Sequence, residues 1–168
     1  MAKPDKPKRS TYDRALDMLE ARARSVTELR RLLITKGEPV DDVDATIERL
    51  RASGLLDDAN YARELTRSKA LGAGLSRRRI QQELTKRGVA RELSTDAIDE
   101  VFEEESIDEG ESIERAARKK LRTLMKLDAP TRRRRLYGFL ARRGFDSDDI
   151  ARVLRALDSE AAELEGGE

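Results

Sequence analysis

The sequence contains an internal repeat, which is centred on Gly37, Gly88 and Gly144 and has spacings of 51 and 56 residues. The residues eight and four positions before each glycine are Leu or Ile, and the residue directly before it is Lys or Arg. Apolar residues recur 10 and 13 positions after each glycine. A repeat of this length is typical of small helical units that bury their apolar faces by stacking on their neighbours.

Each unit is predicted to contain three helices. Apolar residues four positions apart lie on one face of a helix, and the glycine supplies the left-handed residue that ends it. The apolar spacing after the glycine indicates another helix that turns back. The chain is therefore predicted to be all-α, with three tandem three-helix repeats over residues 11–54, 55–105 and 106–157. The basic N-terminus, 1–10, and the acidic tail, 158–168, are predicted to be disordered.

Two sequence signals mark the starts of helices. Ser25 is followed three residues later by Glu28, which is the pattern of a capping box in which the two side chains satisfy free amides. Asp57 and Asp58 follow two leucines, and one of the two aspartates is expected to cap the first helix of the second repeat. Clusters of carboxylates elsewhere in the chain also lie at predicted helix starts, so capping explains them without any catalytic role.

The composition excludes several classes of function. The 168 residues include no cysteine and no histidine, so disulfides, thiolate metal sites and the commonest general base are all missing. No glycine loop for phosphates and no nucleophile with a nearby base is present, and we expect neither catalysis nor a cofactor. No segment has the length and apolarity of a membrane span, and the first ten residues do not resemble a signal peptide. We expect a cytoplasmic monomer.

Basic residues are concentrated in the predicted second helices of the second and third repeats. Residues 106–157 carry 14 Lys and Arg against 8 Asp and Glu, although the net charge of the whole chain is only +1. A basic run at the same place in successive repeats would align into a stripe that suits a phosphate backbone or an acidic protein filament. The alternative is a solvated face that pairs with the acidic third helices. The candidate contact residues are Arg77, Arg78, Lys86, Arg87, Arg132, Arg133, Arg134, Arg135, Arg142 and Arg143.

Four motifs in this order and spacing resemble the RecX family of bacterial regulatory proteins, which modulate the RecA recombinase. The resemblance extends from about Tyr12 to Leu157. The motifs are Ser25 with Glu28, Leu29 and Gly37; Gly54 to Asp58 with Tyr61 and Ala62; Gly74 to Val89; and Phe139, Leu140, Arg143, Gly144, Phe145, Ile150, Val153 and Leu154. The run Arg132 to Arg135 and the acidic tail depart from the family pattern.

The resemblance implies an elongated, curved array of the three repeats. It also implies that the protein binds the RecA filament on single-stranded DNA and suppresses ATP hydrolysis, strand exchange and filament growth. Direct contact with single- or double-stranded DNA is compatible with the basic helices, but no exposed aromatic residues lie between the arginines to stack on bases. Two alternatives stay open. The chain could be a DNA-binding helical protein without recombinase specificity, or a scaffold for a different protein partner.

Overall fold

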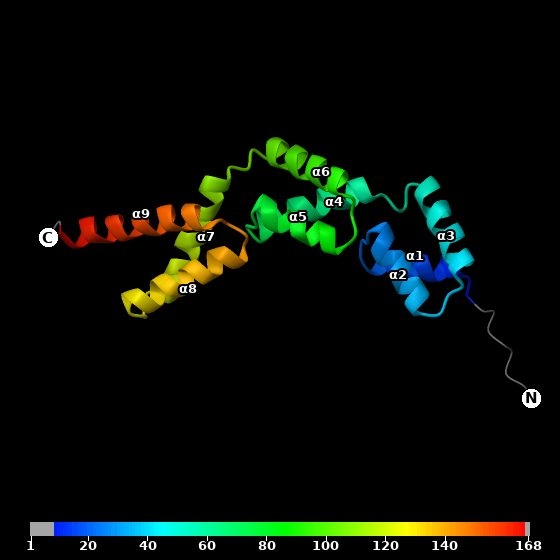
Figure 1. The fold of residues 1–168 in the computed structure, drawn as a ribbon, viewed down its shortest axis with the longest axis horizontal. Coiled ribbons are helices and arrows are strands. Elements are labelled where there is room, and N and C mark those ends of the chain that lie inside the picture. Colours follow the sequence, from blue (N-terminus) through cyan, green and yellow to red (C-terminus); the bar gives the residue numbers. More distant parts are fainter. Residues whose placement is uncertain (1–8, 167–168) are drawn as a thin grey trace, which may run out of the picture.

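The computed structural model describes the backbone of residues 9–166 and the side chains of residues 9–160. Within this part of the chain every regular element is a helix, so the predicted all-α class is confirmed (Figure 1). The elements are α1 (Thr11–Ala21), α2 (Val26–Thr35), α3 (Val40–Ala52), α4 (Asp58–Arg67), a π-helical segment η1 (Ser68–Gly72), α5 (Arg77–Lys86), α6 (Arg91–Glu104), α7 (Glu109–Leu124), α8 (Ala129–Arg142) and α9 (Ser147–Gly166).

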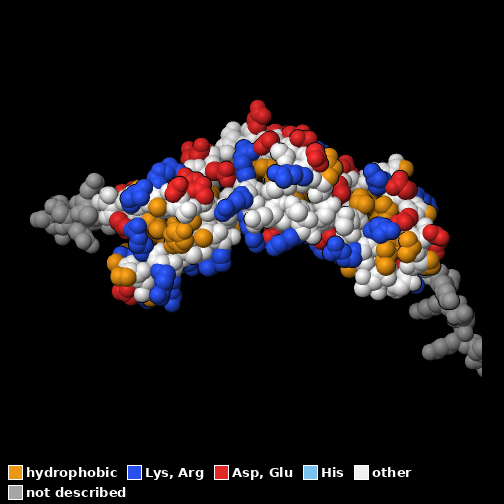
Figure 2. Space-filling view, in the orientation of Figure 1, with side chains coloured by type: hydrophobic (Ala, Val, Ile, Leu, Met, Phe, Trp, Pro, Cys, Tyr) orange, Lys and Arg blue, Asp and Glu red, His pale blue; other side chains and the backbone are white. Residues whose placement is uncertain are grey.

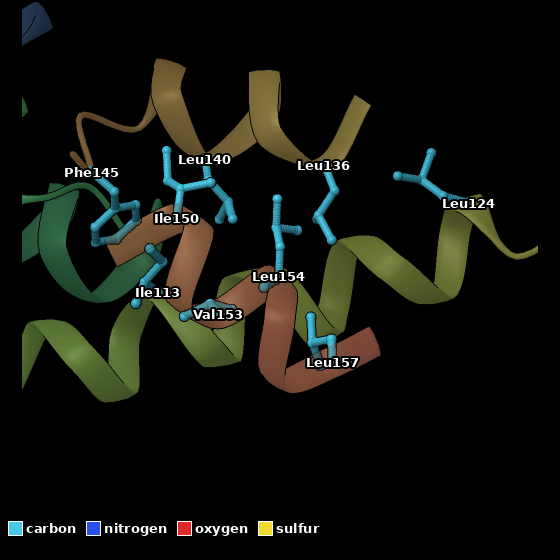
Figure 3. Packing of buried hydrophobic residues seen from close by; sticks show 10 residues of the cluster. Ile113, Leu124, Leu136, Leu140, Phe145, Ile150, Val153, Leu154 and Leu157 are labelled. Carbon is cyan, nitrogen blue, oxygen red and sulfur yellow. The ribbon is translucent and has the colours of Figure 1, made fainter. Parts of the chain in front are cut away.

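Each repeat encloses its own small apolar core. The first core lies among α1 to α3, the second among α4 to α6 and the third among α7 to α9. In the third core, Leu136 and Leu140 of α8 face Ile150 and Leu154 of α9, and Phe145 fills the end nearest the second repeat (Figure 3). The apolar positions of the sequence repeat are therefore the core positions of three separate bundles.

The three bundles follow one another in an elongated, curved array (Figure 1). The helices α3 and α6 lie towards the convex edge, whereas α5 and α8 lie towards the concave edge. Acidic side chains gather along the convex edge and basic side chains along the concave edge below the second and third repeats (Figure 2). The second helices of the last two repeats, which carry the candidate arginines, thus lie towards the same edge of the molecule.

The ends of the array differ from the sequence prediction. Arg9 pairs with Asp17, and Ser10 caps α1 through a capping box with Asp13, so these two residues are not disordered; residues 1–8 lie outside the described part. The predicted disorder from Asp158 is wrong as far as Gly166, because α9 continues through this stretch. Carboxylates on this extension pair with arginines of the third repeat, which favours the helical conformation.

The segment η1 was also not predicted. It continues α4 for one wider turn and leads into Gly74, which has a φ of +61°. A π-helical turn contains an extra residue relative to an α-helix, and therefore sequence periodicity based on 3.6 residues does not reveal it.

Candidate partner-binding surface

The first junction joins the end of α5 to the start of α2. Ser25 Oγ donates a hydrogen bond to the carbonyl oxygen of Arg87, and Thr27 Oγ1 donates to the carbonyl oxygen of Gly88 at 3.1 Å. These serine and threonine hydroxyls therefore satisfy carbonyls that have no partner at the C-terminal end of a helix. Ser25 and Ser76 both lie 12 residues before the glycine of their repeat, and this spacing places a helix start opposite the end of the next repeat's second helix.

The second junction repeats this arrangement between the end of α8 and the start of α5. The backbone N–H of Ser76 donates to the carbonyl oxygen of Arg143 at 3.0 Å. Arg78 Nε donates to the carbonyl oxygen of Gly144 at 3.1 Å, and its Nη2 donates to that of Phe145 at 3.3 Å. Arg78 is therefore bound to the third repeat, although the sequence assigned it to the partner surface.

An acidic residue completes each junction. The N–H of Val26, the first residue of α2, donates to Asp58 Oδ1 at 2.9 Å, and the N–H of Arg77, the first residue of α5, donates to Glu109 Oε1 at 2.9 Å. Asp58 and Glu109 are the first residues of α4 and α7. Burial raises the pKa of Asp58 above its ordinary value despite this hydrogen bond.

Arg87 is also occupied by the first junction. Its Nη1 contacts Glu28 Oε1 at 3.2 Å and donates to the hydroxyl of Tyr61 at 3.1 Å, and the Tyr61 hydroxyl donates to Glu28 Oε2 at 3.3 Å. Burial raises the pKa of the Tyr61 hydroxyl, so the phenol stays protonated at neutral pH. This arginine joins the first and second repeats.

Arg77 and Arg143 are likewise held within the protein. Arg77 pairs with Asp99, and its guanidinium lies 4.2 Å from the centroid of the Phe102 ring. Arg143 Nε donates to the carbonyl oxygen of Ala73 at 3.0 Å, and its guanidinium lies over a phenylalanine of α8. Burial and the neighbouring Arg142 lower the pKa of Arg143, although a guanidinium remains charged at neutral pH. Four of the ten candidate residues thus contribute to the junctions.

The remaining candidates differ in their availability. Arg132 Nη1 donates to the carbonyl oxygen of Leu127 at 3.5 Å, and Arg133 pairs with Asp158. The other four have exposed side chains, and none of them forms an ion pair with any side chain that the structure describes; they are Lys86, Arg134, Arg135 and Arg142. These four cations form the part of the predicted surface that is free to contact a partner.

A second basic surface lies on α7, and the sequence analysis did not include it among the candidate residues. Arg115, Lys119 and Arg122 are all exposed and lie at spacings of four and three residues, which places them on one helical face. Lys120 is partly buried beside them. The spacing is visible in the sequence, but the predicted surface was based on the arginine runs of the second helices, α5 and α8.

Comparisons with known proteins agree with this architecture. Models of the first, second and third three-helix domains of RecX match residues 12–50, 57–98 and 108–154. A regulatory protein RecX from Pelodictyon phaeoclathratiforme is 35% identical over 143 residues, which is 85% of this chain and 86% of the relative. The chain belongs to the RecX family. A regulatory protein RecX from Mycobacterium avium is 38% identical and covers 89% of this chain and 87% of its own length.

Solved RecX structures share the fold. The crystal structure of RecX from Lactobacillus salivarius has a TM-score of 0.66 at 22% identity, covering 88% of this chain and 94% of its own. A second crystal structure, of a regulatory protein RecX, has a TM-score of 0.71 at 23% identity and covers 86% and 71% of the two chains. Across the helices of the described residues, none combines the length and apolarity that crossing a membrane needs.

Proposed function

We propose that this RecX protein is a negative regulator of the RecA recombinase, which binds the RecA filament on single-stranded DNA in the cytoplasm. Binding suppresses ATP hydrolysis, strand exchange and filament growth. Family membership supports the choice of RecA. The observation that carries the proposal is the curved array with basic side chains along its concave edge, since this shape suits a long, polyanionic partner (Figure 2).

The junctions hold the three repeats in fixed relative positions, which allows them to bind one partner together. Hydrogen bonds and ion pairs at Arg78 and Arg87 fix each repeat relative to the next, so the basic side chains of the second and third repeats are presented together. Several weak contacts made at once increase affinity through effective concentration, provided that the geometry allows simultaneous engagement. A rigid array loses less conformational entropy on binding than three flexibly linked repeats would.

The free cations determine the dependence on salt. Lys86, Arg134, Arg135 and Arg142 are exposed, so their attraction to an anionic filament is screened as ionic strength rises. Electrostatic steering also accelerates the encounter with a polyanion. Inhibition should therefore require more protein at high salt than at low salt.

The test is RecA-catalysed ATP hydrolysis on single-stranded DNA, titrated with the protein at less than one molecule per RecA subunit. We expect strong inhibition in this range by the wild type. The variant R134E/R135E should need about fivefold or more protein for the same inhibition, because two exposed attractive charges become repulsive. The control R91E/R155E makes the same change of charge at exposed positions of α6 and α9 and should inhibit like the wild type.

Other results would point elsewhere. Inhibition that begins only when the protein saturates the DNA, with equal DNA affinity in the absence of RecA, would favour the DNA-binding alternative. No inhibition at any ratio would contradict the proposal and favour a scaffold for another protein.

A further inference from the structure

A cleft lies at the second junction, between the π-helical segment of the second repeat and the helices α7 and α8 of the third. Its volume is about 280 Å³. The walls come from Ala70 to Gly74 on one side and from α7, Phe139 and Arg143 on the other. Because the cleft is built from two repeats, it depends on the same contacts that hold them together.

Four cations surround the cleft, and none of the residues that line it is acidic. They are Arg115, Lys119, Lys120 and Arg143. Among the side chains that the structure describes, no carboxylate lies within 4 Å of the ammonium groups of the two lysines. Arg115 approaches Glu111 at 3.9 Å, but both side chains are 75% exposed, so this pair is weak. The charge around the cleft is therefore largely uncompensated.

The cleft also has an apolar part. Leu71 lies on η1 with 54% of its surface exposed, and it lines the cleft together with Ala116 and Phe139. Leu71 lies beside the cations of the cleft, and apolar patches rimmed by polar groups commonly mark interaction sites. Local π-helical turns are frequent at functional sites as well.

Phe139 is engaged by cations of its own chain. The guanidinium of Arg143 lies 3.8 Å from the ring centroid and the ammonium of Lys120 lies 5.5 Å from it. Stacking of a nucleic-acid base needs an open ring face, and this ring is already in cation–π contact. A phosphodiester backbone would neutralise the cations, but it has no apolar group to cover Leu71.

We propose that this cleft binds a short acidic peptide segment of a protein partner, with an apolar side chain against Leu71 and carboxylates against the surrounding lysines and arginines. Charge complementarity selects an acidic ligand, and the apolar part selects a peptide over a nucleic acid. Binding of such a peptide is distinct from the regulation of RecA and can be measured without RecA or DNA.

The test uses a fluorescein-labelled peptide of sequence Glu-Asp-Glu-Leu-Asp-Glu-Asp and fluorescence anisotropy with the full chain. Two comparison peptides replace the acids by their amides or the leucine by glycine. Both should bind at least about threefold more weakly, since each lacks one of the two complementary features. A labelled oligothymidylate of similar charge tests the nucleic-acid alternative.

Variants locate the binding. R115E/K119E should weaken binding of the acidic peptide at least about fivefold, and L71Q at least about threefold, with circular dichroism unchanged. R91E/R155E and R134E/R135E change the charge equally at other exposed positions and should bind the peptide like the wild type. If L71Q or R115E/K119E leaves peptide affinity unchanged, or if the oligothymidylate binds more tightly than the peptide and loses affinity in these variants, the proposal is overturned. RecA inhibition is measured separately, so its failure would leave this result intact.

Discussion

At the residue scale, the two adjacent aspartates at the start of α4 have different roles. Asp57 is the cap of the helix and accepts hydrogen bonds from the N–H groups of Ala59 and Asn60. Asp58 instead accepts the N–H of Val26 from the preceding repeat. The sequence predicted that one aspartate caps the helix, but it gave no sign that the other joins two repeats.

Substitutions of Asp58 should separate its hydrogen bond from its charge. D58A removes the acceptor of a partly buried N–H and should lower the free energy of unfolding by about 1–2 kcal/mol. D58N keeps an acceptor oxygen and removes a carboxylate that burial disfavours, so at pH 7 it should be no less stable than the wild type. The measurement is urea denaturation followed by circular dichroism.

The pH dependence of the stability difference between D58N and the wild type gives a further check. Because the folded protein raises the pKa of Asp58, protonation stabilises the fold, and the penalty for the charged form appears as pH rises through the folded pKa. Any advantage of D58N over the wild type should therefore disappear below the ordinary pKa of aspartate, about 3.9. An advantage that grows towards low pH would contradict this account.

At the element scale, the three glycines of the repeat are equivalent in sequence but not in surroundings. All three have positive φ angles, of +86° at Gly37, +74° at Gly88 and +91° at Gly144. A Cβ added at Gly88 would lie 2.5 Å from Thr27 of the preceding repeat, whereas one added at Gly37 would have nothing within 4 Å. The first repeat has no predecessor among the described residues, so its glycine needs only its backbone angle.

This difference predicts unequal effects of one substitution. G37A should lower the free energy of unfolding by about 1–2 kcal/mol, which is the strain of a left-handed alanine. G88A adds a clash at the junction and should cost about 2 kcal/mol more. Urea denaturation measures both values, and small-angle scattering should show a changed radius of gyration for G88A alone. Equal effects in the two variants would mean that Gly88 does not govern the junction.

The same elements show how far the sequence could predict the structure. Core positions, the capping box at Ser25 and the glycine helix ends follow from local periodicity and propensity, which act within one helix. The roles of Arg78 and Arg87 do not, because an arginine on a helix surface has the same pattern whether it contacts solvent, a partner or another repeat. Their contacts with the neighbouring repeats lie 59 to 67 residues away along the chain. The free cations of α8 were included in the prediction, and those of α7 were missed.

At the scale of the whole molecule, the second helix of the third repeat starts differently from those of the first two repeats. Ser25 and Ser76 precede their glycines by 12 residues, and each donates a hydrogen bond to a carbonyl oxygen at the end of the next repeat's second helix. In the third repeat this position is Arg132, and the cap of α8 is Asp128, one turn earlier. The added turn lengthens α8 and leaves no serine at the place where a fourth repeat would dock.

Such an array is expected to unfold cooperatively only while its junctions are strong, because the stability of repeat proteins depends on interfaces between neighbours. At the first junction, the double substitution Y61F/R87M removes the hydrogen bonds and the ion pair to Glu28 and retains most of the buried volume. The first repeat, residues 11–54, should then open independently of the other two. Hydrogen exchange with mass spectrometry should show about tenfold less protection in its helices, with little change in α7 to α9.

The control is R67M, which removes ion pairs of Arg67 with Glu64, Glu104 and Glu105 inside the second repeat. This variant weakens one bundle and leaves both junctions in place, so protection should fall in all three repeats together. If Y61F/R87M also lowered protection in all repeats together, the hydrogen-bond network at Tyr61 would not be what couples the first repeat to the second. In Y61F/R87M, independent opening of the first repeat should also weaken RecA inhibition, since the array would no longer present its contacts as one rigid surface.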